Sequence, residues 1–333
     1  MVTGSGSMDF HLQKDLQMVE ITAFNKNLSN EWDSFCNQCI QATFLHTQRF
    51  ITYHGSKFRD RSLVIKEKNK IIGLFPAAEL PTDCSIIVSH PGITYGGLLH
   101  CGALIGEDAI QAFQSIATWY SGMGYKRLIY KAIPKIYHQV PCDDDIYALF
   151  RQGALKERVD LSSSINLNNR RSISKRRERS LNRAEKSGVY VSQELNLLGG
   201  MWKVLEDNLM RRHSAKPVHS LPEIIKLAEL FPKEIKCTCA FLEKELIAGV
   251  VTFSTKTCMH AQYIASNQCG YDHSGLDLVF NTLIAEATEN KQQWFDFGIS
   301  NENDGKILNA GLYNFKTEFG GGGIIHEHYE LKL

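Results

Sequence analysis

Three side chains in the second half of the sequence have the chemistry to stabilise a negative charge or to move a proton. Lys316 follows a predicted helix and precedes the run Gly320–Gly323, so its ammonium could act on a developing oxyanion beside closely approaching backbone amides. Tyr263 lies in a predicted strand, where a phenol can orient an acceptor or donate to a leaving group. His213 follows two arginines at the end of a predicted helix and could serve as a general base, because imidazole titrates close to neutral pH.

Each of these residues also has an ordinary structural interpretation. A lysine at a helix C-terminus complements the helix dipole. A strand tyrosine is commonly half-buried, and a histidine at a helix end commonly makes a capping contact. The residue types alone leave both interpretations of Lys316, Tyr263 and His213 open.

The segment from 170 to 187 is the most basic part of the chain. It holds eight basic and two acidic residues, a net +6 in a chain whose total is +1. At about 100° per residue, the outer basic residues form one stripe of a helix, whereas Arg170 and Arg177 fall on its apolar side. The outer stripe is either a solvated face or a patch for an anion. A guanidinium on the apolar side needs a partner, which is either a structural carboxylate or a phosphate or carboxylate of a substrate.

The composition excludes several classes of protein. With 333 residues, 43% hydrophobic and 22% charged, the chain is globular and long enough for two domains. A net charge of +1 provides no overall field for DNA or an anionic membrane. Nine cysteines, without a second Cys/His pair at zinc spacing, indicate reduced thiols and no metal site.

Targeting signals are also not recognised. Residues 1–7 are interpreted as an expression scar, and no apolar signal segment follows Met8. Residues 84–106 carry no charged side chain, but their five glycines argue against a membrane-spanning helix. We therefore expect a cytoplasmic protein with no membrane span.

The order of the predicted elements occurs twice along the chain. In each half, helical sequence is followed by a β-hairpin, a strand, a helix, a strand, another helix and a final strand. Matching elements lie roughly 165 residues apart, which is typical of a whole domain rather than a solenoid repeat. We expect an α/β (α+β) protein of two tandem domains, 8–168 and 169–333, with the basic helix opening the second. Each should contain a mixed, mostly antiparallel sheet flanked by helices.

Several segments carry a recognisable family pattern. The C-terminal ones are Trp294-Phe-Asp-Phe-Gly-Ile-Ser300 and Gly311-Leu-Tyr-Asn-Phe-Lys-Thr-Glu-Phe-Gly320. Earlier come the segments 44–50 and 90–97, the second rich in glycine, and the basic helix from 177 to 191. Together they resemble the Fem-type branch of the GNAT acyltransferase superfamily over about residues 30 to 331.

This resemblance implies two GNAT-like domains and the transfer of an acyl or aminoacyl group to an amine. It places Lys316 at the donor carbonyl, with Phe315 beside it as a substrate contact, and Tyr95 at the acceptor. Tyr263 lies on the strand that lines the acyl-transfer cleft of GNAT sheets. Arg170 and Arg177 would bind a phosphate or carboxylate of the substrate.

The donor loop departs from the family pattern. Asn267 and Gly275 bound the segment that corresponds to the pyrophosphate-binding loop of CoA-dependent members, and both are candidate donor contacts. Tyr271 and His273 stand where that loop has glycines. Because a helix N-terminus binds phosphate through closely approaching amides, this departure weakens the CoA interpretation. The tRNA interpretation is weakened as well, since no long heptad stretch suggests a helical hairpin for tRNA.

These observations predict an N-acyltransferase that moves an acyl group from acyl-CoA to an amine. The acceptor is expected to be a small molecule, an amino sugar, nucleotide-linked or not, or another cell-envelope precursor. The attacking amine must be neutral, so its proton needs an acceptor. The alternatives are an aminoacyl-tRNA-dependent peptidyltransferase of peptidoglycan bridge synthesis and a non-catalytic GNAT-like binding module. We expect no permanently bound cofactor, no metal and no DNA partner.

Overall fold

The computed structural model of the protein describes residues 19–213 and 215–333, and the side chains of residues 212 and 213 lie outside what it describes. The segment interpreted as an expression scar, residues 1–7, lies outside the described residues.

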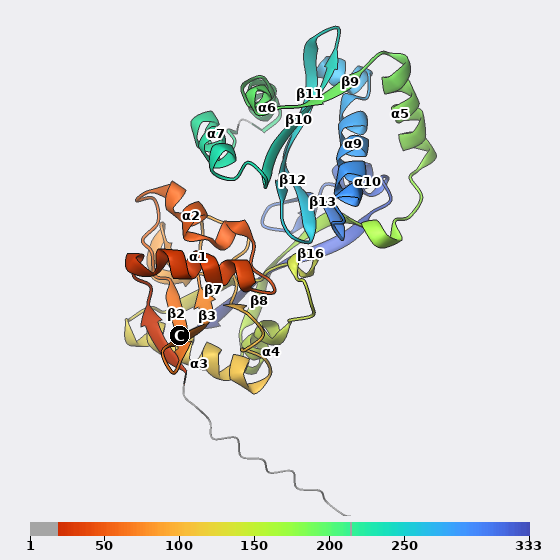
Figure 1. The fold of residues 1–333 in the computed structure, drawn as a ribbon. Helices are drawn as coiled ribbons and strands as arrows, with labels where there is room; N and C mark the ends of the chain where they lie inside the picture. The colour runs from red at the N-terminus through yellow and green to blue at the C-terminus, as the bar shows by residue number, and fades with distance from the viewer. Residues whose placement is uncertain (1–18, 214) are drawn as a thin grey trace, which may run out of the picture.

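A ten-stranded sheet runs through both halves of the described chain (Figure 1). Its strands lie in the order β4 (Ala78–Leu80), β5 (Asp83–Val88), β7 (Arg127–Lys131), β16 (Gly322–Lys332), β8 (Leu155–Asn166), β13 (Trp294–Ile299), β12 (Cys258–Ser266), β11 (Glu245–Ser254), β10 (Ile235–Leu242) and β9 (Tyr190–Gln193). Within the described residues, β5–β7 and β12–β13 pair in parallel and the other ladders are antiparallel. The predicted α/β class with mixed, mostly antiparallel pairing is confirmed.

The sheet is shared between the two halves through β8 and β16. Strand β16, the last of the chain, pairs with β8 along most of its length and with β7 of the first half through His328–Lys332. Strand β8 then pairs with β13 of the second half. The two halves therefore exchange strands across residue 168, which the order of elements along the sequence did not indicate.

The first half adds a second sheet and four α-helices. Its four strands are β1 (Glu20–Ala23), β2 (Leu63–Glu67), β3 (Lys70–Phe75) and β6 (Leu99–His100). Its α-helices are α1 (Ser29–Gln38), α2 (Gln48–Ile51), α3 (Glu107–Gly122) and α4 (Asp144–Arg151). The predicted hairpin turn is present, with Lys68 and Asn69 at φ 49° and 64°.

The second half covers both faces of its part of the sheet. Helices α6 (Leu198–His213) and α7 (Leu221–Leu230) lie on one face, and α5 (Lys175–Lys186) and α9 (Gly275–Glu289) lie on the other (Figure 1). Strand β11 is consequently buried along seven consecutive residues, as expected for a strand packed on both sides. The short α8 (Gln268–Asp272), the strands β14 (Asn301–Glu302) and β15 (Ile307–Leu308), and α10 (Ala310–Thr317) complete this half.

Candidate active site

Two parallel strands separate in the second half of the chain. The ladder of β12 and β13 ends at the pair His260–Asp296, although β12 continues along β11 as far as Ser266. The register of β13 against β8 shifts between Asp296 and Ile299, and Gly298 has a φ of 78°, a left-handed conformation that glycine adopts at little cost. Strand β13 thus bends away from β12 and leaves main-chain groups of both strands facing a gap.

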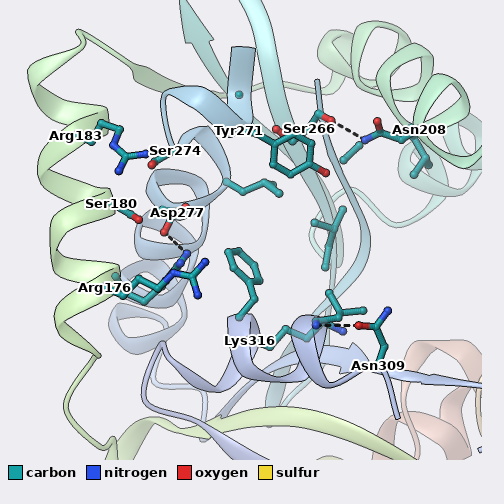
Figure 2. A pocket seen from close by; sticks show the side chains of 18 of the residues that line it. Arg176, Ser180, Arg183, Asn208, Ser266, Tyr271, Ser274, Asp277, Asn309 and Lys316 are labelled. Carbon is teal, nitrogen blue, oxygen red and sulfur yellow. Dashed lines mark hydrogen bonds and ion pairs between the residues drawn. The ribbon is translucent and has the colours of Figure 1, made fainter. Parts of the chain in front are cut away.

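A cavity of about 720 Å³ lies at the edge of this gap. Its walls are the end of β12, the basic helix α5, the facing side of α6, the α8–α9 junction and α10. Figure 2 shows Arg176 and Arg183 of α5 on one side, Asn208 and Ser266 on the other, and Lys316 of α10 between them. Asn208 Nδ2 donates to the carbonyl of Ser266 over 2.6 Å, so α6 holds the free end of β12 in place.

Lys316 combines a buried ammonium with access to this cavity. Its side chain lines the cavity and is 3% exposed. Nζ donates to the carbonyls of Gly298 and Ile299 over 2.9 and 2.7 Å, which are the carbonyls of β13 that the separation of the strands leaves without a strand partner. Burial lowers the pKa of Lys316 to about 8, although the Asp296 carboxylate opposes the shift. The lysine is therefore fixed at the mouth of the gap and remains charged at neutral pH.

Phe315 and Arg177 form a packed unit beside the lysine. The guanidinium of Arg177 lies 4.7 Å from the ring centroid of Phe315, and both residues line the cavity. Arg177 is 4% exposed and is ion-paired with Asp277 and, over 2.9 Å, with Glu318. Of the two partners that the sequence left open for Arg177, the structure contains the structural carboxylates.

The outer basic stripe faces the cavity as well. Arg176, Arg179 and Arg183 line it and are exposed. Arg176 lies 3.8 Å from Glu318, and no ion pair within the described residues involves Arg179 or Arg183. Because an exposed arginine fork suits phosphate oxygens, this wall of the cavity favours an anionic ligand.

The α8–α9 junction is filled by its own side chains. Asn267 caps α8 by accepting from the backbone N–H of Gly270 over 2.8 Å, and Gly275 packs α9 closely against Ile247 and Ala248. Asp277 lies in the first turn of α9. Burial raises the pKa of Asp277, whereas Arg177 and the backbone N–H of Asp277 itself oppose that shift. A carboxylate thus occupies the helix N-terminus that would otherwise attract a phosphate, and the two donor-binding candidates have structural contacts.

Tyr263 lies on the other face of β12. It packs against Trp202 of α6, with ring centroids 4.8 Å apart, whereas its neighbour Ile264 lines the cavity. Its hydroxyl contacts Nδ1 of His219, and Nε2 of that histidine lies 2.7 Å from the hydroxyl of Tyr53. Burial raises the pKa of Tyr263 to about 12. The tyrosine therefore belongs to a chain of three polar rings that connects the two halves of the protein.

The remaining candidates from the sequence lie outside this cavity. Tyr95 is 2% exposed and stacks on Tyr137 with centroids 4.5 Å apart. Arg170 donates from Nε to the carbonyl of Phe319 over 3.0 Å, and burial lowers its pKa. His213 is the last residue of α6, and its side chain lies outside the described part of the chain.

Comparison with known proteins places this geometry in a family. Residues 168–316 match the family described as acetyltransferase (GNAT) domain. The solved structure of FemX has a TM-score of 0.66 at 11% identity, covering 94% of this chain and 97% of that chain. The chain has the fold of the Fem-type branch of the GNAT superfamily. No curated protein sequence matches it.

Two further solved structures share this GNAT fold. L-PGS from Bacillus licheniformis has a TM-score of 0.58 at 13% identity, with 90% of both chains covered. A tandem GNAT protein from the clavulanic acid biosynthesis pathway has a TM-score of 0.53 at 8% identity, covering 94% of this chain and 98% of that chain. At these identities the likeness concerns the fold, and it agrees with the tandem arrangement.

One cluster in this GNAT fold was missed by the sequence analysis. Asp296 is fully buried; its Oδ2 accepts from Nδ1 of His260 over 2.7 Å and its Oδ1 accepts from the hydroxyls of Ser162 and Ser164. The signal was the alternation Phe295-Asp296-Phe297 in a predicted strand, because a carboxylate among buried positions must have donors. Its partner could not be identified, since His260 is 36 residues away in sequence.

Two further surveys concern metals and membranes. Within residues 19–213 and 215–333, no group of three or more His, Cys, Asp or Glu side chains is arranged to hold a metal ion. No helix in the described chain has both the length and the apolar character needed to cross a bilayer.

Proposed function

We propose that this GNAT-fold protein is a cytoplasmic N-acyltransferase that transfers an acyl group from acyl-CoA to an amine. The acceptor in this proposal is an amino sugar or another cell-envelope precursor, as the Fem-type resemblance implies. The observation that carries the proposal is the buried ammonium of Lys316 at the point where β12 and β13 separate, beside a cavity of about 720 Å³.

The lysine supplies the electrostatic part of the reaction. An ammonium has three N–H donors, and two of those of Lys316 bind the carbonyls of Gly298 and Ile299. The third remains for the oxygen of a thioester carbonyl placed in the cavity. A preorganised charge in a site shielded from water stabilises the oxyanion that forms when the amine attacks.

The arginine wall supplies the anion-binding part. The phosphates of CoA would lie against Arg176, Arg179 and Arg183 rather than at the N-terminus of α9, because Asp277 occupies that terminus. The apolar side chains of Leu205, Leu209 and Ile264 line the same cavity and would contact the acyl chain.

The proposal is tested by ligand binding and thiol release with matched tryptophan variants. Acetyl-CoA and longer acyl-CoAs should raise the melting temperature of the wild type, because a ligand that binds the native state stabilises it. Leu312→Trp should abolish this shift and the amine-dependent release of CoA, because Leu312 lines the cavity. Leu308→Trp is the control, since Leu308 is comparably exposed (44% against 41%) and does not line it.

Two outcomes would contradict the proposal. One is the absence of both a thermal shift and thiol release across a panel of amino sugars and nucleotide-linked amino sugars. The other is an equal response of the two tryptophan variants.

The exposed arginines favour a second candidate, which is aminoacyl transfer from tRNA. Charged tRNA in place of acyl-CoA would then stabilise the protein, with an affinity that falls steeply with salt because bound phosphates release counterions. Charge reversal at Arg176 and Arg179 would abolish that binding. Indifference of tRNA binding to salt and to both reversals would exclude this candidate.

A further inference from the structure

The pair of His260 and Asp296 occupies the vertex at which the two parallel strands part. These residues form the last matched pair of the β12–β13 ladder. A Cβ built on Gly298 would lie 3.4 Å from Cε1 of His260, and the carbonyl of the same glycine accepts from Lys316. The imidazole and the ammonium of Lys316 thus lie on either side of one residue of β13.

The environment of Asp296 keeps its carboxylate charged and in a fixed position. Burial alone would raise its pKa, but the hydrogen bond from His260, the nearby charges and the Ser162 hydroxyl hold the pKa well below its usual range. Since one carboxylate oxygen accepts from Nδ1 of His260 and the other from two serines, neutral His260 must carry its proton on Nδ1. The lone pair of its Nε2 is then available.

His260 also borders a space between the two halves. A small cavity is lined by Thr94, Tyr95 and Tyr137 of the first half and by His260 and Gln262 of the second. Its free volume of about 10 Å³ is about that of one water molecule, which is also the size of an amine nitrogen with its hydrogens. Within the described residues, Nε2 of His260 has no hydrogen-bond partner.

We propose that His260 is the general base that takes the proton of the attacking amine, and that Asp296 is the positioning residue that fixes its tautomer. The acceptor amine would approach through the cavity between the halves, past Tyr95, while the thioester lies on the Lys316 side of the gap. This inference rests on the proposed acyl transfer, and it assigns the proton acceptor that the transfer requires.

The proton balance of the step is closed. The amine nitrogen forms a bond to the thioester carbonyl carbon, and the bond from that carbon to sulfur breaks. Nε2 of His260 takes one proton from the nitrogen, and the leaving thiolate takes the proton from the imidazolium. The products are the amide and the free thiol, and the histidine returns to its neutral state.

The groups around His260 determine how its titration is interpreted. Asp296 of β13 is in direct contact. His326 of β16 interacts electrostatically with both His260 and Asp296, and Asp160 of β8 lies near His326. Lys316 of α10 interacts with Asp296, and Tyr95 and Tyr137 line the cavity. A pH profile must therefore be compared between variants rather than assigned to one group.

The test uses His260→Asn, because the asparagine amide can still donate to Asp296 but has no basic nitrogen. With acetyl-CoA as donor and glucosamine as acceptor, we expect kcat to fall about 10²–10³-fold and the thermal shift with acetyl-CoA to remain. Hydroxylamine, which is neutral at pH 7 and needs less help from a base, should be acetylated within about threefold of the wild-type rate. Asp296→Asn should reduce the glucosamine rate similarly, and His328→Gln, on a neighbouring strand, should leave all rates unchanged.

The outcomes separate this inference from the proposed function. If the wild type transfers acetyl groups but His260→Asn keeps its glucosamine rate, or loses the glucosamine and hydroxylamine rates equally, His260 is not the base. If the wild type neither binds acetyl-CoA nor releases CoA, the proposed function fails first. Nitrogen-15 NMR of the histidine side chains then tests the pair independently of activity: the Nδ1–H tautomer of neutral His260 is expected, and the Nε2–H tautomer would overturn the assignment.

Discussion

The two halves of the protein contain the same parallel pair of strands, but they treat the end of it differently. In the first half, the β5–β7 ladder continues past Val88: Ser89 donates to the carbonyl of Ile129 over 2.9 Å and Gly96 donates to that of Lys131 over 3.0 Å. In the second half, β12 and β13 separate after His260 and Asp296. The segment from 89 to 97 thus fills the space that forms the cavity in the second half.

A buried lysine is present at both places. Lys131 donates from Nζ to the carbonyls of Ile93 and His90, as Lys316 does to those of Gly298 and Ile299. Burial lowers the pKa of both lysines to about 8. The difference is that Lys131 binds a loop that closes the gap, whereas Lys316 borders an open cavity. A buried lysine bound to main-chain carbonyls is therefore not by itself a catalytic feature.

The largest expected effect separates these two lysines. Lys316→Met should reduce kcat about 10²–10³-fold, the loss typical of removing one oxyanion donor. Lys131→Met should leave kcat per folded molecule unchanged but lower the free energy of unfolding by about 1–3 kcal/mol, since it leaves buried carbonyls without a donor. Steady-state thiol release combined with urea denaturation measures both. Equal losses of kcat in the two variants would show that the comparison is wrong.

The next effect concerns the closed gap. A Cβ on Gly96 would lie 1.9 Å from the carbonyl oxygen of Ser89, so Gly96→Ala must displace the segment and should destabilise the protein by about 3 kcal/mol. Gly275→Ala is the matched change in the second half, where the new methyl group meets flexible side chains at 3.1 Å and beyond. It should cost about 1 kcal/mol. Urea midpoints that show the opposite order would contradict the account of the filled gap.

A smaller effect follows from the pKa of Lys316. The charged form stabilises the oxyanion, and the pKa lies near 8, so activity that depends on this charge is lost as the pH rises through 8. Between pH 7 and pH 9 the charged fraction, and with it kcat, should fall about tenfold, without a matching fall in the unfolding midpoint. An unchanged kcat up to pH 10 would show that the lysine charge is not used.

The smallest effect concerns the arginine wall. Arg179→Glu and Arg183→Glu should each raise the Kd of acetyl-CoA about fivefold, because these side chains line the cavity at its exposed edge. Lys186→Glu is the control, since Lys186 lies on the same stripe without lining the cavity. Calorimetric titration at two salt concentrations should show that the difference shrinks as the salt is raised. An equal response to all three reversals would mean that only net charge matters.

The sequence predicted the elements better than their long-range pairing. Helix and strand periodicity, together with glycine stops such as Gly188, located the hairpins, the basic helix and the alternation of strands and helices, because those signals are local. The exchange of β8 and β16 between the halves depends on pairing between residues more than 150 apart, such as Glu327 and Val159, which local patterning does not encode.

The same distinction applies to the candidate site. Arg177 was assigned to the apolar side of its helix, and it is buried, because helical geometry fixes that direction. The partner of Asp296 and the second face of β12 occupied by Tyr263 depend on packing between distant segments. Lys316 was found through the resemblance of its motif, whereas its two carbonyl partners depend on the bend at Gly298, which requires the structure.

Hydrogen-exchange mass spectrometry with and without acetyl-CoA tests most directly whether the donor binds where β12 and β13 separate. We predict slower exchange in peptides that cover the end of β12, the exposed side of α5 and α10 around Lys316, with no change in the segment from 89 to 97. Protection of residues 89–97 instead, or no protection in either half at saturating ligand, would contradict the account.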